Sequence, residues 1–172
     1  MERVMVIGCG GSGKSTLARQ LGEKTGLPVV HLDQIWWAPG NWQHLEDAEF
    51  VERLTEELEK PRWIMDGNFN RTIPLRLTYC DTVIFLDFPR LLCVLGVLRR
   101  VLGNYGRTRP DMAPGCPEKF DPAFLKWVWN WRKNHRSRVL ALLEESPAQK
   151  IILKNRRQVN RFLNNIRNEV LS

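Results

Sequence analysis

A glycine-rich segment near the start of the chain has the residue types and spacing needed to bind phosphate. Residues 8–15 read GCGGSGKS, which matches the pattern GxxxxGK followed by Ser or Thr. Glycines let the backbone turn its N–H groups toward a phosphate, and a following helix adds its positive N-terminal end. Lys14 is expected to reach the β- and γ-phosphates of ATP, and the Ser15 hydroxyl to hold Mg²⁺. The predicted nucleotide-binding residues of this segment are Gly8, Gly10, Gly11, Ser12, Gly13, Lys14, Ser15 and Thr16.

An aspartate follows the second buried run of the chain. Residues 29–32 are typical of a short strand, and Asp33 comes directly after them. A carboxylate beside an attacking hydroxyl orients that hydroxyl and can take its proton, so Asp33 is a candidate catalytic and acceptor-binding residue. Aspartate also commonly begins helices and turns. The position after a strand favours the catalytic interpretation, because sites in parallel sheets lie at the carboxyl ends of the strands.

Three tryptophans, Trp36, Trp37 and Trp42, lie close behind Asp33. Their flat, amphipathic rings could stack on a base or line an acceptor pocket, and Trp36 is a candidate substrate-binding residue on this ground. Tryptophan is equally common as core filling, so both interpretations stay open at this point.

A long segment rich in proline and glycine, residues 104–122, has no apolar period. A loop of this length inside a compact domain is usually functional or disordered. Arginines that close over a transferring phosphoryl group stabilise the charge on its oxygens, and a mobile loop that delivers them excludes water. Each could instead be an ordinary exposed charge. The candidate catalytic arginines in and beside this loop are Arg100, Arg107 and Arg109.

The elements that must position these residues alternate along the chain. The predicted strands cover residues 4–7, 29–32, 63–65, 82–86 and 151–153, and the predicted helices cover 14–25, 47–59, 91–102, 122–144 and 158–170. This order predicts an α/β protein with a five-stranded parallel sheet and helices on both faces, in the three-layer manner of P-loop NTPases. One domain, residues 1–172, is expected, with a short Arg-rich lid at about residues 103–121.

Composition narrows the class of protein further. The chain has 172 residues, is 43% hydrophobic, and carries a net charge of +7. This balance favours polyanionic ligands such as nucleotides, nucleic acid or an acidic membrane surface, without choosing among them. The four cysteines form no CxxC pair, and the apolar stretch 82–98 is interrupted by Asp87 and Arg90. A cytoplasmic protein with reduced thiols and no membrane span is expected, and the oligomeric state stays open.

Several further segments carry a resemblance to a known family. They are HLDQIWWAPGNW at 31–42, WIMDGNFNRT at 63–72, CDTVIFLDFPR at 80–90 and RRVLGNYGRTRPDMAPGCPEKFD at 99–121. With the glycine-rich loop, they make the chain resemble adenylate-kinase-like P-loop kinases. Within these it is most similar to the bacterial "DNA topology modulation" (FlaR-type) proteins. The resemblance covers nearly the whole chain.

The resemblance implies roles for residues that spacing alone does not assign. Asp66 would support Mg²⁺ through water, and Gly67 would let the acceptor approach the backbone. Arg71 matches the arginine that clamps an acceptor phosphate, although the intervening segment is about a residue longer here. Arg132 would bind phosphate from the helix after the lid, and Asn155 would lie in the loop beside the adenine.

The sequence therefore predicts an ATP- and Mg²⁺-dependent phosphotransferase acting on a small acceptor, expected to be a nucleotide or nucleoside. An arginine clamp would favour a monophosphate acceptor, whereas Asp33 would favour a hydroxyl. The alternative is an ATP-binding protein that acts on DNA, as the family name suggests, yet the chain has no recognised DNA-reading motif. A GTPase-like switch is disfavoured because no NKxD-type guanine motif occurs.

Overall fold

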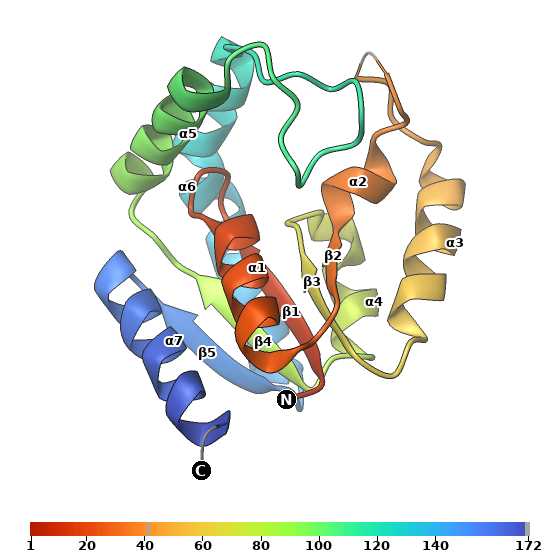
Figure 1. Ribbon diagram of the computed structural model, residues 1–172, viewed down its shortest axis with the longest axis vertical. Helices are drawn as coiled ribbons and strands as arrows, with labels where there is room; N and C mark the ends of the chain where they lie inside the picture. Colours follow the sequence, from red (N-terminus) through yellow and green to blue (C-terminus); the bar gives the residue numbers. More distant parts are fainter. Residues whose placement is uncertain (41, 171–172) are drawn as a thin grey trace.

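The computed structural model describes residues 1–40 and 42–170, with side chains described up to residue 166. Within these residues, five parallel strands form one sheet in the order β2-β3-β1-β4-β5. This arrangement confirms the predicted fold class (Figure 1). The strands are β1 (Arg3–Gly8), β2 (Val29–His31), β3 (Trp63–Asp66), β4 (Thr82–Leu86) and β5 (Gln149–Leu153).

Helices cover both faces of the sheet. Helices α1 and α7 contact one another on one face, and α6 crosses the opposite face (Figure 1). The helices are α1 (Lys14–Thr25), α2 (Leu32–Trp36), α3 (Asp47–Leu58), α4 (Ile73–Leu77), α5 (Arg90–Asn104), α6 (Pro122–Glu145) and α7 (Arg156–Val170), with a 3₁₀ turn, η1 (Asn70–Thr72).

The central strands are apolar throughout because both faces of the sheet are covered. Every residue of β3 and β4 is buried, and so are the last five residues of β1. Parallel strands covered on both sides read as continuous apolar runs, which is why residues 4–7 and 82–86 could be recognised without alternation. The sheet thereby holds the loops after β1, β2 and β3 at one edge.

Short elements differ most from the sequence-based expectation. The second strand ends at His31, and Leu32 begins α2, so Asp33 lies in the first turn of a short helix. Neither α4 nor η1 was predicted, because a five-residue helix with Pro74 in its first turn shows no apolar period. Helix α7 begins at Arg156, two residues before the predicted start.

The segment after α5 folds over the carboxyl edge of the sheet and has a small apolar cluster of its own. Met112, Ala113 and Cys116 are buried there against Trp37 and Trp42. Two hydrogen bonds join the same parts of the chain: Gln34 Nε2 donates to Pro110 O at 2.6 Å, and Gly40 N donates to Pro114 O at 2.8 Å. Residues 105–121 are called the lid below.

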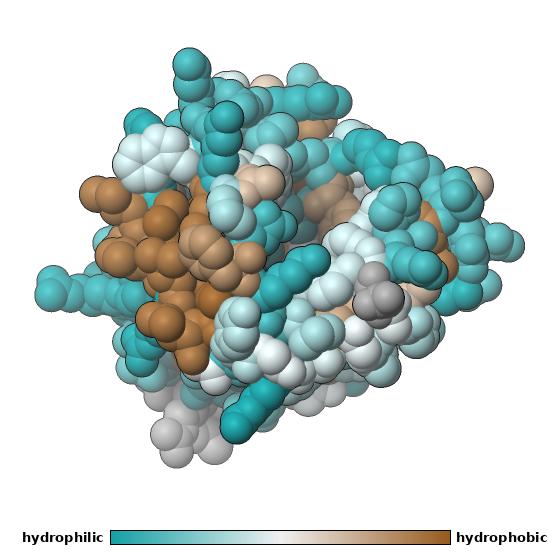
Figure 2. Space-filling model, turned by 90° about the horizontal axis from the view of Figure 1, so that it is seen from above, coloured by the Kyte–Doolittle hydropathy of each residue, from teal (hydrophilic) through white to brown (hydrophobic). Residues whose placement is uncertain are grey.

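Apolar side chains also gather on the surface over α5 (Figure 2), where Leu91, Leu95 and Leu102 are exposed. In the part of the chain that the structure describes, no helix combines the length and apolar character that a bilayer crossing needs.

Candidate active site

A cavity of about 980 Å³ lies at the carboxyl edge of the sheet, between the glycine-rich loop, α5 and the lid. For the function proposed below, we call the lining residues from the glycine-rich loop, α5, α6 and α7 the donor half, and those from α2, the segment after β3 and the adjoining part of the lid the acceptor half. The donor half is lined by Gly10, Gly11, Gly13, Lys14, Gly96, Arg99, Arg100, Phe124, Trp127 and Arg156. The acceptor half is lined by Asp33, Gly67, Asn68, Phe69, Asn70, Pro110 and Asp111.

The backbone of the donor half requires glycine at two positions of the loop. Gly13 caps α1 with φ 91°, and Gly11 has φ 76°, in the left-handed region that side chains rarely adopt. A Cβ on Gly11 would lie 2.1 Å from Cys93 O, and one on Gly96 would lie 2.1 Å from Gly11 O. The loop and α5 are therefore in direct backbone contact.

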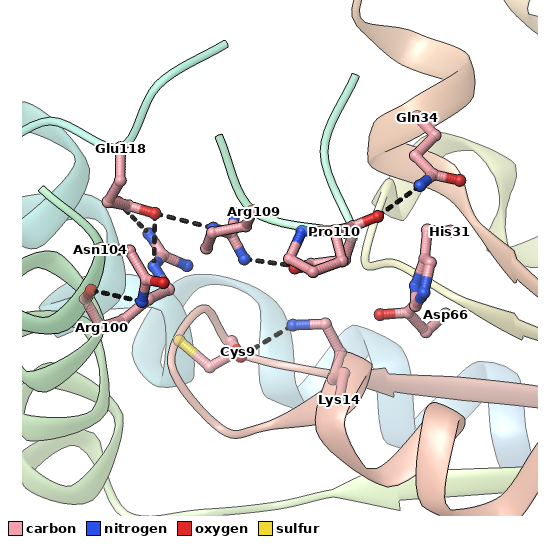
Figure 3. A network of polar contacts seen from close by, with 11 residues as sticks. Cys9, Lys14, His31, Gln34, Asp66, Arg100, Asn104, Arg109, Pro110 and Glu118 are labelled. Atoms are coloured by element: carbon pink, nitrogen blue, oxygen red, sulfur yellow. Dashed lines mark hydrogen bonds and ion pairs between the residues drawn. The ribbon is translucent and has the colours of Figure 1, made fainter. Parts of the chain in front are cut away.

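The N-terminus of α1 is open toward the cavity. Gly13 supplies no side-chain cap, and the first turn contains no acidic residue. Lys14, Ser15 and Thr16 all line the cavity at this point. Unpaired N–H groups and the positive end of a twelve-residue helix make an anion-binding site. Lys14 Nζ donates to Cys9 O at 3.0 Å and so lies over the loop (Figure 3).

Four arginines reach the cavity from α5, the lid and α7, and two of them are held by lid carboxylates. Arg100 Nε lies 3.1 Å from Glu118 Oε2, and Arg109 Nε lies 2.8 Å from the same oxygen. Arg109 Nη1 also lies 2.5 Å from Asp111 Oδ2 (Figure 3). Burial, with the charge of Arg109, lowers the pKa of Arg100. The other two, Arg99 and Arg156, line the cavity from α5 and from the start of α7.

Carboxylates gather at the acceptor half. Burial and the nearby charge of Asp66 raise the pKa of Asp33 to about 6, although Lys14 and Arg109 oppose the shift. Asp111 is 5% exposed, and burial raises its pKa, but the Arg109 guanidinium, hydrogen bonds that include one from Ser15, and the charge of His31 together lower it overall. Asp33 is therefore a carboxyl group that changes charge close to neutral pH.

Asp66 lies just outside the cavity lining, where it is buried and hydrogen-bonded to His31 Nδ1. The two residues end neighbouring strands and are paired in register. Burial alone lowers the pKa of His31, but the hydrogen bond and the charge of Asp66 raise it, and the net direction is upward. The pair fixes Asp66 in position behind Gly67.

Several residues expected at the site lie elsewhere. Arg107 is exposed on the lid outside the cavity lining. Arg132 Nη1 donates to Asp87 Oδ1 at 2.7 Å, so it joins α6 to the end of β4. Asn155 Oδ1 accepts from Gln158 N at 2.9 Å and caps α7.

Two acceptor-side candidates also have other partners. Arg71 forms a two-bond ion pair with Asp47 on the surface, and its guanidinium lies over the Trp36 ring. Trp36 itself packs edge-on against Phe50 and Phe69 and stacks on His44. Of the two readings of Trp36, the structure supports core packing.

Sequence reasoning missed Arg156, Asp111 and the pairing of His31. Arg156 lies inside the turn 155–158 that was expected beside the adenine but was not singled out, and its guanidinium would touch a Cβ on Gly13 at 2.3 Å. Asp111 lies two residues after Arg109, inside a loop already singled out. His31 lies at the end of a predicted strand, as Asp66 does, but only the strand order reveals that the two strands are neighbours.

No protein-family model matches the sequence, and no curated protein matches it either. Several solved structures do match it, and they agree with this architecture. Shikimate kinase from Acinetobacter baumannii, solved with shikimate, is similar in structure with a TM-score of 0.60 at 16% identity, over 99% of this chain and 93% of that chain.

Two further solved structures show the same likeness. Deoxyadenosine kinase from M. mycoides, solved with dCMP and dCDP, has a TM-score of 0.57 at 13% identity, over 98% of each chain. A gluconokinase from Sinorhizobium meliloti has a TM-score of 0.54 at 13% identity, over 99% of this chain and 95% of that chain. The chain thus shares the fold of small P-loop kinases along its full length.

Proposed function

We propose that the protein is an ATP-dependent phosphotransferase that transfers the γ-phosphoryl group of ATP to a small acceptor. One observation carries the proposal: an open helix N-terminus with Lys14 and a carboxyl group, Asp33, line the same cavity. The first feature binds phosphate, and the second can receive a proton. The solved kinases that share the fold support this reading.

The donor half fits the triphosphate of ATP. Backbone N–H groups of the glycine-rich loop and the start of α1 surround the phosphates, and Lys14 reaches the terminal ones. Arg99, Arg100, Arg109 and Arg156 would oppose the charge that spreads over the transferring oxygens. Arg107, exposed outside the cavity, has no part in this arrangement.

The donor atoms around Ser15 suit Mg²⁺. Ser15 and Asp111 bring a hydroxyl and a carboxylate oxygen to one cavity, and Mg²⁺ prefers oxygen ligands of this kind. Ser15 would hold the ion beside the phosphates, and Asp66, kept in place by His31, would order its water from behind the cavity wall. Bound there, the ion would offset phosphate charge.

We assign to Asp33 the role of taking the proton of the acceptor hydroxyl. In the proposed step an acceptor hydroxyl oxygen forms a bond to the γ-phosphorus as the bond to the bridging oxygen of ADP breaks. The hydroxyl proton passes to the Asp33 carboxylate, and ADP carries away the electron pair. Because the pKa of Asp33 is about 6, the carboxylate is ionised at neutral pH. Turnover should therefore fall as the pH drops through that value.

Incubation of the protein with γ-labelled ATP, Mg²⁺ and a pool of nucleosides, nucleotides and hydroxyl metabolites tests this proposal. We expect the label to move to an organic product. Lys14→Ala should lower the rate by about two to three orders of magnitude, as removal of one electrostatic stabiliser does. Lys126→Ala, an exposed lysine of α6 outside the cavity lining, is the matched control. ATP turnover that appeared only with DNA, with no small product labelled, would reject the proposal.

A further inference from the structure

We infer that the acceptor is an uncharged or cationic hydroxyl compound, and that a phosphate monoester or a carboxylate is not the preferred substrate. This inference rests on the proposed phosphoryl transfer. Two observations carry the inference. The arginines on the acceptor side already have hydrogen-bond partners, and some polar groups at that end have none among the described residues.

Arg71, the arginine expected to clamp an acceptor phosphate, is turned away from the cavity. Both of its terminal nitrogens are hydrogen-bonded to Asp47 of α3, and Trp36 lies beneath the guanidinium. Moving it into the cavity would break that ion pair and the cation–π contact together.

Arg76, the other arginine of this region, is completely buried and acts on the backbone. It donates to Gly67 O at 2.9 Å, to Asn68 O at 2.6 Å and to Phe69 O at 3.3 Å. A buried guanidinium that satisfies consecutive carbonyls holds the wall of the acceptor half from behind. Its Nη1 and Nη2 donors are therefore committed to the backbone, and its Nε, which has no partner among the described residues, is buried away from the cavity lining.

Lys14 lies over the glycine-rich loop, and two further cations line the cavity near this end. Arg109 comes from the lid, but its guanidinium is held between Asp111 and Glu118, both buried. Arg19 lines the cavity from the exposed surface of α1, one turn beyond Ser15. An anion bound at this end would lie beside the carboxylates of Asp33 and Asp111, which both line it.

Two hydrogen-bond acceptors at this end have no committed donor in the part of the chain that the structure describes. The Asp33 carboxylate lines the cavity, and Asn70, which also lines it, has an Oδ1 atom with no partner among the described residues. The Asn68 amide already has a partner. When its oxygen faces the Trp131 indole, that oxygen accepts a hydrogen bond from Trp131 Nε1 at 2.6 Å. A ligand that satisfies Asp33 and Asn70 must bring donors, as the hydroxyls of a sugar, polyol or nucleoside and the ammonium of an amino alcohol do.

A competition among acceptors of different charge tests the inference. The wild-type protein would receive γ-labelled ATP, Mg²⁺ and equal concentrations of four sets: neutral polyols, sugars and nucleosides; amino alcohols; hydroxycarboxylates; and nucleoside or sugar monophosphates. We expect the highest kcat/KM within the first two sets. A higher value in either anionic set would overturn the inference while leaving the proposed phosphoryl transfer intact.

Failure of the proposed function gives a different result. If ATP–Mg²⁺ binds but no member of the four sets is labelled, the phosphotransferase proposal falls and the inference falls with it.

The Asn70→Ala variant provides the second arm. We expect the acceptor KM to rise about tenfold with the KM for ATP unchanged, because a hydrogen bond to the acceptor is lost. Asn130→Ala, an asparagine on α6 whose amide donates to Lys126 O, should change neither value. An unchanged acceptor KM in Asn70→Ala would remove Asn70 from the acceptor site and contradict the inference.

Discussion

The two halves of the cavity are built in opposite ways. The centre of the donor half is backbone from one continuous loop and the helix that follows it, in close contact with α5, and side chains of α5, α6 and α7 surround that centre. The acceptor half is made of side chains from α2, from the segment after β3 and from the lid, which are distant in sequence. Under the proposed function, backbone geometry within one loop recognises a nucleotide phosphate, whereas the acceptor is recognised by side chains that tertiary packing brings together.

This contrast explains why arginines that lie near the site in the sequence line the cavity in one half and bind other groups in the other half. On the donor side, the arginines line the cavity. On the acceptor side, Arg71 and Arg76 have found partners in Asp47 and in backbone carbonyls. An arginine near a site in the sequence is therefore evidence for phosphate binding only after its other partners are known. The experiments below change one half of the cavity at a time.

Replacing Arg76 should damage the acceptor half most. Burial lowers the pKa of Arg76 to about 9, so it stays protonated at neutral pH. Arg76→Leu leaves the carbonyls of Gly67, Asn68 and Phe69 without their donor, and we expect a loss of about 3–5 kcal/mol in the free energy of unfolding. Urea denaturation measures this change. Arg53→Leu, at an exposed ion pair with Glu49, is the control and should change stability by less than about 1 kcal/mol.

A methyl group at Gly96 should strain the donor half. The Cβ of Gly96→Ala would lie 2.1 Å from Gly11 O, so the loop or α5 must shift. We expect a loss of about 1–3 kcal/mol in thermal unfolding experiments, with weaker ATP binding, as in other overpacked sites. Gly103→Ala lies on the same helix with nothing within 4 Å and should be neutral or stabilising by up to about 1 kcal/mol. Equal effects at the two glycines would disprove the proposed tight contact.

Removing the Asp33 charge should stabilise the protein while abolishing its role as a base. The pKa of Asp33 is raised in the folded state from 3.8 to about 6, so its ionisation disfavours folding above that pH. Asp33→Asn should therefore increase the free energy of unfolding by about 1–3 kcal/mol at neutral pH. The gain should shrink as the pH falls from about 6 through 4 and vanish at about pH 3, where the wild-type carboxyl group is protonated in both states. Denaturation curves at several pH values that show a constant difference would contradict the assignment.

Arg71→Ala should have the smallest effect of the series. The pair with Asp47 is exposed, and pairs of this kind contribute about 0–1 kcal/mol. Turnover should change by less than about twofold, since the side chain does not line the cavity. Steady-state kinetics test this expectation. A tenfold rise in the acceptor KM would show that Arg71 binds an acceptor phosphate after all.

The fold and the position of the glycine-rich loop could be predicted from the sequence because their signals are local. Apolar runs such as residues 82–86 identify buried strands, and the spacing of Gly8, Gly13 and Lys14 specifies a loop that is closed by its own backbone. The acceptor half could not be predicted in the same way. Whether Arg71 binds a phosphate or Asp47 depends on where α3 lies, and Trp36 could be assigned to the core only once Phe50 and Phe69 were placed beside it.

The contact of the lid with Trp37 and Trp42 has a thermodynamic consequence. Opening the cavity would expose Met112, Ala113 and Cys116 together with both indoles, so the closed arrangement is held partly by the hydrophobic effect. Exposure of apolar surface increases heat capacity, and the balance between open and closed forms should therefore curve with temperature. Indole emission followed over a temperature range would then report the opening of the cavity, with Trp42→Phe showing which ring carries the signal.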